Sequence, residues 1–390
     1  MSRIRPSVAF TSYYGDLGGG ELRLLEHLRL TRIPRADLSV VLCEHGPLKQ
    51  RIQEIGIPVA IIRWNRATRR PWRAVQTVLA KRRLRRHLRR HRVRVLFCNT
   101  YNDLLLGAPA ARSLGIPIVW RSHADVFPYL GDDERQAVAR FVRENVTRVL
   151  PTTDYDRRLI VGAGVEADRV HVVRLGVDAS LYADPGGRWR RAMRAALGFG
   201  SDDRVFGFVA RLVPQKGHLV FLDALERVAA KCPGVRALVV GDAAADGSDP
   251  DGYRDRVRRA AEHAGLSDRI AFTGFRDDVP ALLAAIDVFV HASLREPFGT
   301  VIVEAMAAGK PVIASRTLGP EEIITDGVTG LLTPPGDAKS LADAMLRLLD
   351  DRALAARLAA CGRAMVQERY DLRRTISELD HHLLEVAEAR

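Results

Sequence analysis

Short apolar runs alternate with helix-type patterns along almost the whole of this 390-residue chain. A buried strand is predicted at Ser7–Thr11, followed by a loop over Ser12–Gly20 and a helix over Glu21–Leu30. Further strands are predicted at Leu38–Cys43, Val59–Ile62, Val93–Cys98, Ile116–Trp120, Arg204–Ala210, Val235–Gly241, Ile270–Thr273, Asp287–Ala292 and Pro311–Ala314. Strands that alternate with helices form parallel sheets built from βαβ units. The chain is therefore predicted to belong to the α/β class.

The length predicts two domains, because 390 residues exceed what one hydrophobic core usually supports. We expect one domain over residues 1–180, a second over residues 181–370 and a final helix over residues 371–390. The segment Pro185–Gly200 is rich in glycine and arginine, and we interpret it as the connection between the domains. The final helix carries one apolar stripe, formed by Leu372, Ile376, Leu379, Leu383 and Val386.

Composition excludes several classes of protein. The four cysteines are far apart and form no CxxC pair, which predicts no disulfide framework or zinc site and favours a reducing compartment. The N-terminal apolar run, Val8–Phe10, is too short for a signal peptide. No stretch approaches the roughly 18 apolar residues of a membrane span. We expect a cytoplasmic protein, or one that lies peripherally at the inner face of the cell membrane.

Positive charge is concentrated in the first half of the chain. Residues 1–178 hold 32 Lys and Arg against 17 Asp and Glu, a net charge of +15, whereas residues 179–390 carry a net charge of −2. Arg63–Arg94 alone holds 14 basic residues and no acidic one. This asymmetry predicts that something anionic meets the first half.

The basic stretch is predicted to form a helix over Ala74–His91. Its apolar residues drift around the helix, with Val75, Val78 and Leu79 on one face and Leu84 and Leu88 nearly opposite. A helix that lies on a membrane would keep a single apolar stripe. Two interpretations stay open: a solvated helix whose arginine stems cover the sheet, or contact with an anionic membrane surface or acceptor.

The stretch from His291 to Ser315 joins two predicted strands through a loop and a helix. Pro297 keeps Glu296 extended in the loop, and the helix is predicted to begin near Thr300, with Thr300 as its cap and Glu304 about one turn inside. The free N–H groups of a helix start bind anions, and carboxylates accept hydrogen bonds from paired hydroxyls. A nucleotide-sugar has both an anionic diphosphate and paired hydroxyls. A retaining glycosidase is the weaker interpretation, because its two carboxylates must lie about 5 Å apart.

The segment EPFGTVIVE, which contains Glu296 and Glu304, resembles the donor-site motif of the retaining glycosyltransferase family 4, also called glycosyl transferases group 1. The segment ARLVPQKG, which contains Arg211 and Lys216, resembles the diphosphate motif of that family, with Ala210 in place of its usual first glycine. Two cations at a strand–helix junction suit a diphosphate and offset the charge of the glutamates.

Three further segments extend the resemblance. GFRDD, Gly274–Asp278, is similar to the stretch that borders the nucleotide base, and Gly319–Gly330 matches the usual run of the family. Val170–Asp178 resembles the last strand and exit of the N-terminal domain. The resemblance covers most of the chain and is densest from Arg204 to Asp337.

The resemblance implies a GT-B fold, in which two Rossmann-like domains with parallel sheets face each other across a cleft. The C-terminal domain would bind a UDP- or GDP-linked sugar, the N-terminal domain would bind the acceptor, and the final helix would cross back to the N-terminal domain. The implied reaction is transfer of the sugar to an acceptor hydroxyl, which attacks the same face so that the anomeric configuration is retained.

The resemblance also assigns roles to individual residues. The candidate catalytic residues are His123, near the reacting carbon, Arg211 and Lys216, on the leaving diphosphate, and Glu296, on a hydroxyl of the donor sugar. The candidate donor-binding residues are Arg211 and Lys216 together with Gly19, Gly20, Phe275, Phe298, Gly299, Thr300, Val301 and Glu304, of which Glu304 would hold the ribose diol.

No cofactor and no metal are expected, because the two cations already meet the diphosphate. The D-x-D pattern at Asp249–Asp251 is interpreted as a surface loop. The favoured acceptor is a lipid-linked or cell-surface glycan precursor, with a soluble metabolite as the alternative. A sugar-nucleotide epimerase of the same fold and a nucleic-acid-binding protein are the less favoured functions; product analysis without an acceptor would expose the first, and salt-dependent binding to DNA or RNA the second.

Overall fold

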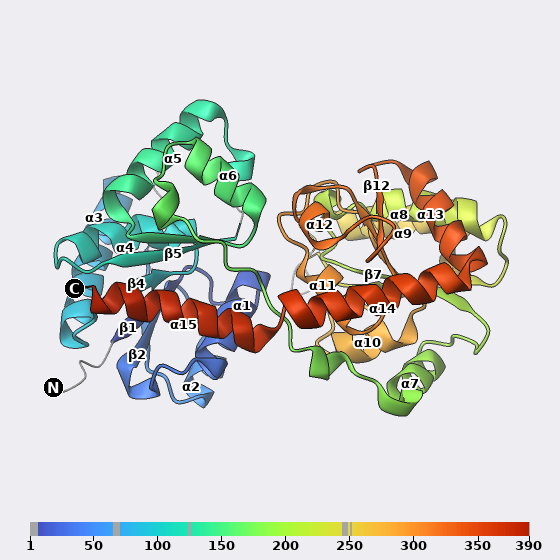
Figure 1. Ribbon diagram of the computed structural model, residues 1–390, viewed down its shortest axis with the longest axis horizontal. Helices are drawn as coiled ribbons and strands as arrows, with labels where there is room; N and C mark the ends of the chain where they lie inside the picture. The colour runs from blue at the N-terminus through green and yellow to red at the C-terminus, as the bar shows by residue number, and fades with distance from the viewer. Residues whose placement is uncertain (1–6, 65–70, 124–125, 244–248, 250–251, 390) are drawn as a thin grey trace. The chain divides into compact units, whose positions relative to one another are not determined.

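The computed structural model describes residues 7–64, 71–123, 126–243, 249 and 252–389. The chain divides into two compact units: a first unit of Met1–Leu175 with Arg373–Arg390, and a second unit of Gly176–Leu372. In each unit a parallel sheet is flanked by helices (Figure 1).

The first unit is built on a sheet of six parallel strands in the order β3-β2-β1-β4-β5-β6. Its strands are β1 (Val8–Ser12), β2 (Leu38–Leu42), β3 (Val59–Ile61), β4 (Val95–Cys98), β5 (Ile118–Ser122) and β6 (Arg148–Pro151). Its helices are α1 (Gly19–Leu30), α2 (Pro47–Glu54), α3 (Pro71–Arg90), α4 (Tyr101–Arg112), α5 (Asp132–Asn145), α6 (Asp154–Gly162) and α15 (Leu372–Glu388). In the centre of the sheet, Phe10 of β1 lies between Val40 and Phe97.

The second unit repeats this topology, with the strand order β12-β11-β10-β7-β8-β9. Its strands are β7 (Arg204–Val209), β8 (Val235–Val240), β9 (Ile270–Phe272), β10 (Val288–His291), β11 (Val312–Ser315) and β12 (Leu331–Thr333). Its helices are α7 (Arg188–Ala196), α8 (His218–Ala229), α9 (Tyr253–His263), α10 (Val279–Ala285), α11 (Thr300–Ala307), α12 (Leu318–Ile323), α13 (Ala338–Asp350) and α14 (Arg352–Arg369). Both orders are those of a doubly wound nucleotide-binding fold.

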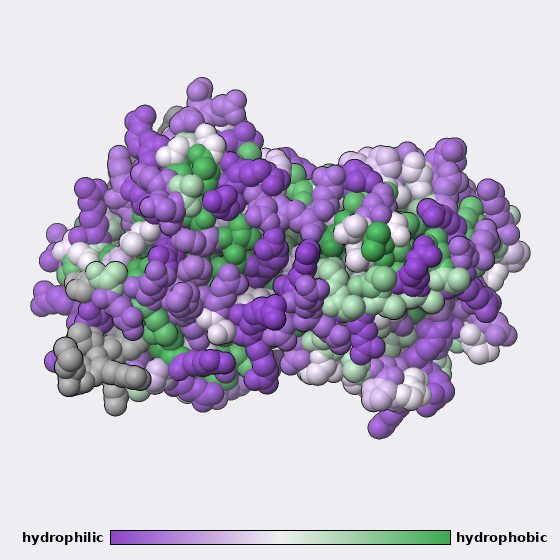
Figure 2. Space-filling view, viewed as in Figure 1, coloured by the Kyte–Doolittle hydropathy of each residue, from purple (hydrophilic) through white to green (hydrophobic). Residues whose placement is uncertain are grey.

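The predicted strands are continuous apolar runs because helices cover both faces of the sheet. Every residue of β1, β2 and β4 is buried, as in parallel sheets that helices cover on both sides. Polar side chains dominate the visible surface, where hydrophobic residues occupy small separate areas (Figure 2). Strand and helix types are confirmed for the predicted elements, with ends shifted by one or a few residues.

Three local predictions are wrong. Helix α1 begins at Gly19, so Gly19 and Gly20 lie in its first turn rather than in the preceding loop. Residues 170–178 form no strand: Val170 makes one isolated bridge to Val149 of β6, which is the last strand of the sheet. Residues 185–200 are not a connection between units, because they contain α7 and belong to the second unit. Arg194 holds α7 in the second unit, because its buried guanidinium donates hydrogen bonds to Asp287 and to backbone carbonyls.

The apolar residues of helix α3 lie on different faces, as its sequence predicts. Leu84 and Leu88 are fully buried, whereas Val78 and Leu79 are about half exposed at 49% and 45%. The side chain of Val75 lies outside the described residues. No helix in the described part of the chain is long and apolar enough to cross a membrane.

Helix α15 docks on the first unit through both apolar and polar contacts. Its predicted stripe is buried from Leu372 to Val386. At its centre, Asp380 lies 2.9 Å from Nε2 of His27 and accepts hydrogen bonds from the Thr31 hydroxyl at 2.7 Å and the Arg32 backbone at 2.8 Å. The Asp380 carboxylate therefore fixes the end of α1 to α15.

Candidate active site

The candidate site of the second unit lies where the strand order reverses, between the neighbouring strands β7 and β10. Open α/β sheets bind ligands outside the carboxyl ends of their strands at such a switch point. The loop after β7 contains Arg211 and Lys216, and the loop after β10 contains Glu296. The two loops are hydrogen-bonded to each other: Leu294 donates its backbone N–H to Gln215, and the Gln215 amide donates to the carbonyl of Arg295.

This pairing of loops brings a cation and a carboxylate together. Nζ of Lys216 donates to Oε2 of Glu296 at 2.6 Å, and Nε2 of His291 lies 2.9 Å from the same oxygen. The Ser293 hydroxyl lies 3.0 Å from Nε2 of His291 and donates to Glu296 at 3.4 Å. Only 8% of the Glu296 side chain is exposed. Lys216, which is half-buried, and the buried His291, Ser293 and Glu296 thus form one polar cluster, which we call the Lys–Glu cluster.

The cluster keeps Glu296 ionised. Burial alone raises the pKa of Glu296, but the hydrogen bond from His291 and the positive charge of Lys216 outweigh it, and the pKa falls well below its usual range. The carboxylate is therefore an acceptor for hydroxyl donors at neutral pH.

Two glycines allow the loops to approach. Gly217 has φ of +75°, and a Cβ there would lie 2.0 Å from the carbonyl oxygen of Ala292, so no side chain fits between the loops. Gly299 has φ of +95° and is the N-cap of α11. Both conformations favour glycine because a Cβ would be strained there.

The start of α11 carries no side-chain cap. The prediction that Thr300 caps this helix is wrong: Thr300 is its first residue, and the left-handed Gly299 occupies the cap position. A left-handed glycine offers no side-chain oxygen to the first N–H groups. Those groups and the helix dipole remain suited to an anionic ligand.

The other predicted donor-binding residues of the second unit fall into two sets. Arg211 is exposed, and in the described part of the chain no acidic side chain pairs with it. Phe275, which follows β9, is 58% exposed. Val301 and Glu304 are half-buried on α11. The ring of Phe298 is instead buried against Tyr370, at a centroid distance of 6.0 Å, so its side chain is not open to a ligand.

A second polar group lies at the switch point of the first unit. Nε2 of His123, just after β5, lies 3.3 Å from Oδ1 of Asn99, which follows β4. The Asn99 amide donates to the carbonyl of Gly20 at 3.4 Å. A Cβ on Gly20 would come within 3.7 Å of the His123 ring. Burial and the neighbouring Arg121 lower the pKa of His123 to about 3, so its imidazole is neutral at physiological pH.

Three residues of these sites were not predicted. His291 and Ser293 contact Glu296, and Asn99 links Gly20 with His123. Their common signal is a polar side chain in the last position of an apolar run or just after it. That position places a side chain at the carboxyl edge of the sheet.

Asp249 of the D-x-D pattern has a structural role. Its carboxylate accepts hydrogen bonds from the backbone N–H groups of Tyr253 and Asp255 and so caps α9. Asp251 lies outside the described residues. Within the described ranges, no group of three or more His, Cys, Asp or Glu side chains is placed to hold a metal ion.

Comparison with known families assigns both units. Residues 17–181 match the model of Glycosyltransferase Family 4, and residues 190–365 match the model of Glycosyl transferases group 1. The two parallel sheets with their helices have the GT-B fold of the solved glycosyltransferases described below. The chain belongs to glycosyltransferase family 4, as its motifs predict.

Curated relatives match part of this chain. D-inositol 3-phosphate glycosyltransferases of Mycobacterium bovis and Mycobacterium tuberculosis are 37% identical over 232 residues, which are 58% of this chain and 45% of each relative. The chain thus spans less than half the length of the curated relatives it matches.

Solved structures match nearly the whole chain. HepE of Anabaena in complex with UDP is 27% identical, with a TM-score of 0.85 over 97% of this chain and 100% of that protein. Its complex with UDP-glucose is 27% identical, with a TM-score of 0.82 over 98% and 99% of the two chains. Sucrose-phosphate synthase of Thermosynechococcus elongatus, 21% identical with a TM-score of 0.77 over 99% and 100% of the two chains, shares the fold.

Proposed function

We propose that this protein transfers a sugar from a UDP-linked donor to an acceptor hydroxyl with retention of the anomeric configuration. The Lys–Glu cluster beside the uncapped start of α11 carries the proposal, because it combines cationic, carboxylate and N–H groups at one switch point. HepE, whose structures hold UDP and UDP-glucose, supports UDP over GDP as the carrier.

The second unit supplies the chemistry for departure of the diphosphate. Negative charge on the diphosphate grows as the glycosidic bond breaks, so Lys216, Arg211 and the first N–H groups of α11 stabilise the transition state more than the bound donor. Glu296, held ionised, accepts a hydrogen bond from a sugar hydroxyl. Glu304 accepts from the ribose diol, and Phe275 offers an exposed ring to the base.

The first unit contributes a neutral group. Because the pKa of His123 lies at about 3, its imidazole acts as a hydrogen-bond partner rather than as a cation. We assign it to the reacting end of the donor, together with the backbone of Gly19 and Gly20. The acceptor attacks the same face that the diphosphate leaves.

The net charge of the first half favours an anionic acceptor. A lipid-linked or cell-surface glycan precursor at the inner face of the membrane meets this requirement, and Arg63–Arg94 would then contact an anionic membrane surface. The curated relatives, whose names specify D-inositol 3-phosphate, favour the alternative of a soluble phosphorylated metabolite.

A thermal-shift screen tests the donor site. The purified protein is incubated with UDP, UDP-glucose, GDP and GDP-mannose, each with and without EDTA. We expect stabilisation by the uridine compounds that EDTA does not change. Loss of the shift with EDTA would contradict metal independence, and no shift with either nucleotide would contradict the donor site. Release of a new sugar nucleotide without any acceptor would identify an epimerase instead.

A further inference from the structure

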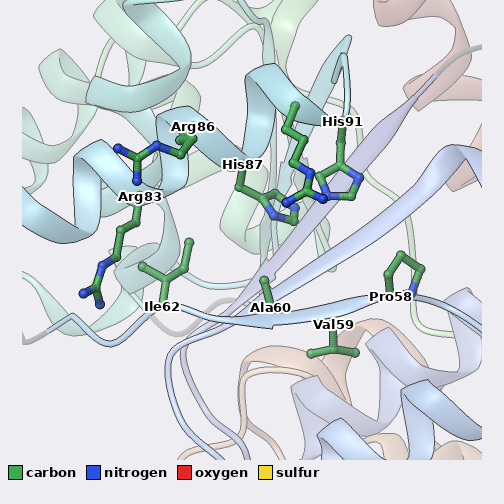
Figure 3. Close-up of a pocket in the computed structure, with 9 residues that line it drawn as sticks. Pro58, Val59, Ala60, Ile62, Arg83, Arg86, His87 and His91 are labelled. Carbon is green, nitrogen blue, oxygen red and sulfur yellow. The ribbon is translucent and has the colours of Figure 1, made fainter.

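A cavity of about 340 Å³ opens between helix α3 and the edge strand β3 of the first unit. Its helix side is formed by Arg83, Arg86, His87, Arg90 and His91, and its strand side by residues 58–60 and 62. Figure 3 shows His87 and His91 side by side between the helix and the strand. The cavity lies outside the candidate active site, and its arginines belong to the stretch Arg63–Arg94 that the proposed function places near an anionic membrane surface.

The three arginines share one flank of α3, because spacings of three and four residues return to the same side of a helix. All three are exposed, and among the described residues none has an acidic partner. Three guanidinium groups on one flank without a counter-charge repel one another. Each presents the planar set of N–H donors that binds phosphate oxygens in pairs.

The two histidines place further N–H donors beside the arginines. The rings of His87 and His91 are 4.3 Å apart, and Nε2 of His87 lies 3.2 Å from the hydroxyl of Ser39 on β2. Burial, with the neighbouring His91 and Arg90, lowers the pKa of His87 to about 4. An anion in the cavity would offset the charges that oppose protonation.

The strand side gives the cavity an apolar wall. Pro58, Ala60 and Ile62 present carbon atoms toward the helix, whereas the side chain of Val59 points away from it (Figure 3). A bare inorganic anion would leave this wall without a partner. The volume is at the lower end of the range of small-molecule sites. A small organic molecule with a phosphate group fits both walls.

The cavity runs along β3, and none of Gly20, Asn99 and His123 lines it. The carbonyl of His91 accepts a hydrogen bond from the hydroxyl of Ser7, which directly precedes β1. His91 therefore lies at the amino edge, whereas Gly20, Asn99 and His123 lie at the carboxyl edge. A ligand in the cavity would therefore not occupy the site of these three residues.

We propose that this cavity is a separate binding site for the phosphate group of a small phosphomonoester, held by Arg83, Arg86 and Arg90. The same group occurs in a soluble metabolite and in a lipid headgroup, and either source presents the same chemistry to the arginines.

Calorimetric titration with glycerol 3-phosphate at constant ionic strength tests the site. The triple variant R83Q/R86Q/R90Q removes the arginines of the cavity. The triple variant R82Q/R85Q/R89Q removes the same charge from the opposite flank of α3 and is the matched control. All six side chains are exposed, so both variants are expected to fold, which an unchanged Tm and an unchanged shift with UDP would establish.

We expect saturable binding that the cavity variant weakens at least about tenfold and the control leaves unchanged. Equal weakening by the two variants would show a diffuse charge effect, and the absence of saturable binding to the wild type would also overturn the proposal. Co-sedimentation with phosphatidylglycerol vesicles, with phosphatidylcholine vesicles as the reference, identifies the source. Vesicle binding lost only in the cavity variant assigns the site to a headgroup, whereas glycerol 3-phosphate binding without vesicle binding assigns it to a soluble molecule. Because UDP binding is measured in the same samples, failure of this proposal is distinct from failure of the donor site.

Discussion

The two units have the same strand order, yet the chemistry at their switch points differs. In the second unit the loops after β7 and β10 hold the charged Lys–Glu cluster. In the first unit the corresponding edge holds the neutral pair of Asn99 and His123 beside the backbone of Gly20. The excess positive charge of the first unit lies elsewhere, including α3. Topology therefore fixes where a ligand binds, and the loop residues decide which ligand it is.

The largest effect is expected at the charged edge. Lys216→Ala should lower kcat by about 100- to 1,000-fold with a smaller change in KM for the donor, because the charge of Lys216 acts most strongly on the leaving diphosphate. Steady-state kinetics with UDP-glucose measure both constants. Lys339→Ala, which removes an exposed lysine of α13, is the control. A rise in KM with kcat unchanged would show that Lys216 does not stabilise the leaving diphosphate in the transition state.

The next largest effect is a loss of stability that we expect in the first unit alone. Asp380→Ala breaks the buried contact with His27 and should destabilise the first unit by about 3 kcal/mol, because it leaves partners of the carboxylate unsatisfied. Hydrogen exchange measured by mass spectrometry should show lost protection in α1 and α15, with β7–β12 unchanged. Asp343→Ala, which removes an exposed ion pair, should cost less than about 0.5 kcal/mol. Equal loss of protection in both units would contradict this assignment.

A pH effect is expected in the second unit. Burial and the charge of Lys216 lower the pKa of His218 to about 3, so the unfolded chain binds more protons than the folded one between pH 3 and 6.5. Stability therefore rises with pH across this window and is lost on acidification. At pH 5, relative to pH 8, the loss from this residue is about 2 kcal/mol. Denaturation measured at the two pH values should show that the free energy of unfolding of His218→Phe changes with pH by that much less than that of the wild type. An unchanged pH dependence would contradict the assignment to His218.

The smallest effect is expected at the neutral edge. His123→Gln keeps a hydrogen-bonding side chain and should lower kcat about tenfold, within the range for one hydrogen bond, while the affinity for UDP stays unchanged. Turnover assays and calorimetry with UDP measure the two quantities. A loss of UDP affinity equal to the loss of kcat would mean that the neutral edge contributes to nucleotide binding itself.

Most strands could be predicted because a buried strand is a short apolar run, and α15 could be predicted because its apolar residues form one regular stripe; β6 and β12 were not predicted. The loop contacts could not be predicted. Glu296 and Lys216 are 80 residues apart, and they meet because the backbone carbonyl and the side-chain amide of Gln215 are hydrogen-bonded to residues 294 and 295. The contact of His291 with Glu296 could not be predicted, because His291 is the last residue of an apolar strand. Residues 185–200 were misread, since their glycines indicate a connection whereas the buried Arg194 anchors a helix.

The most direct test compares UDP with UMP on the wild type and on Lys216→Ala. If the Lys–Glu cluster and α11 hold the diphosphate, calorimetry should show tighter binding of UDP than of UMP by the wild type. Lys216→Ala should then lose most of that preference and retain its affinity for UMP. Equal affinities of the wild type for UDP and UMP, or a preference that survives in Lys216→Ala, would contradict the assignment of this cluster to the diphosphate.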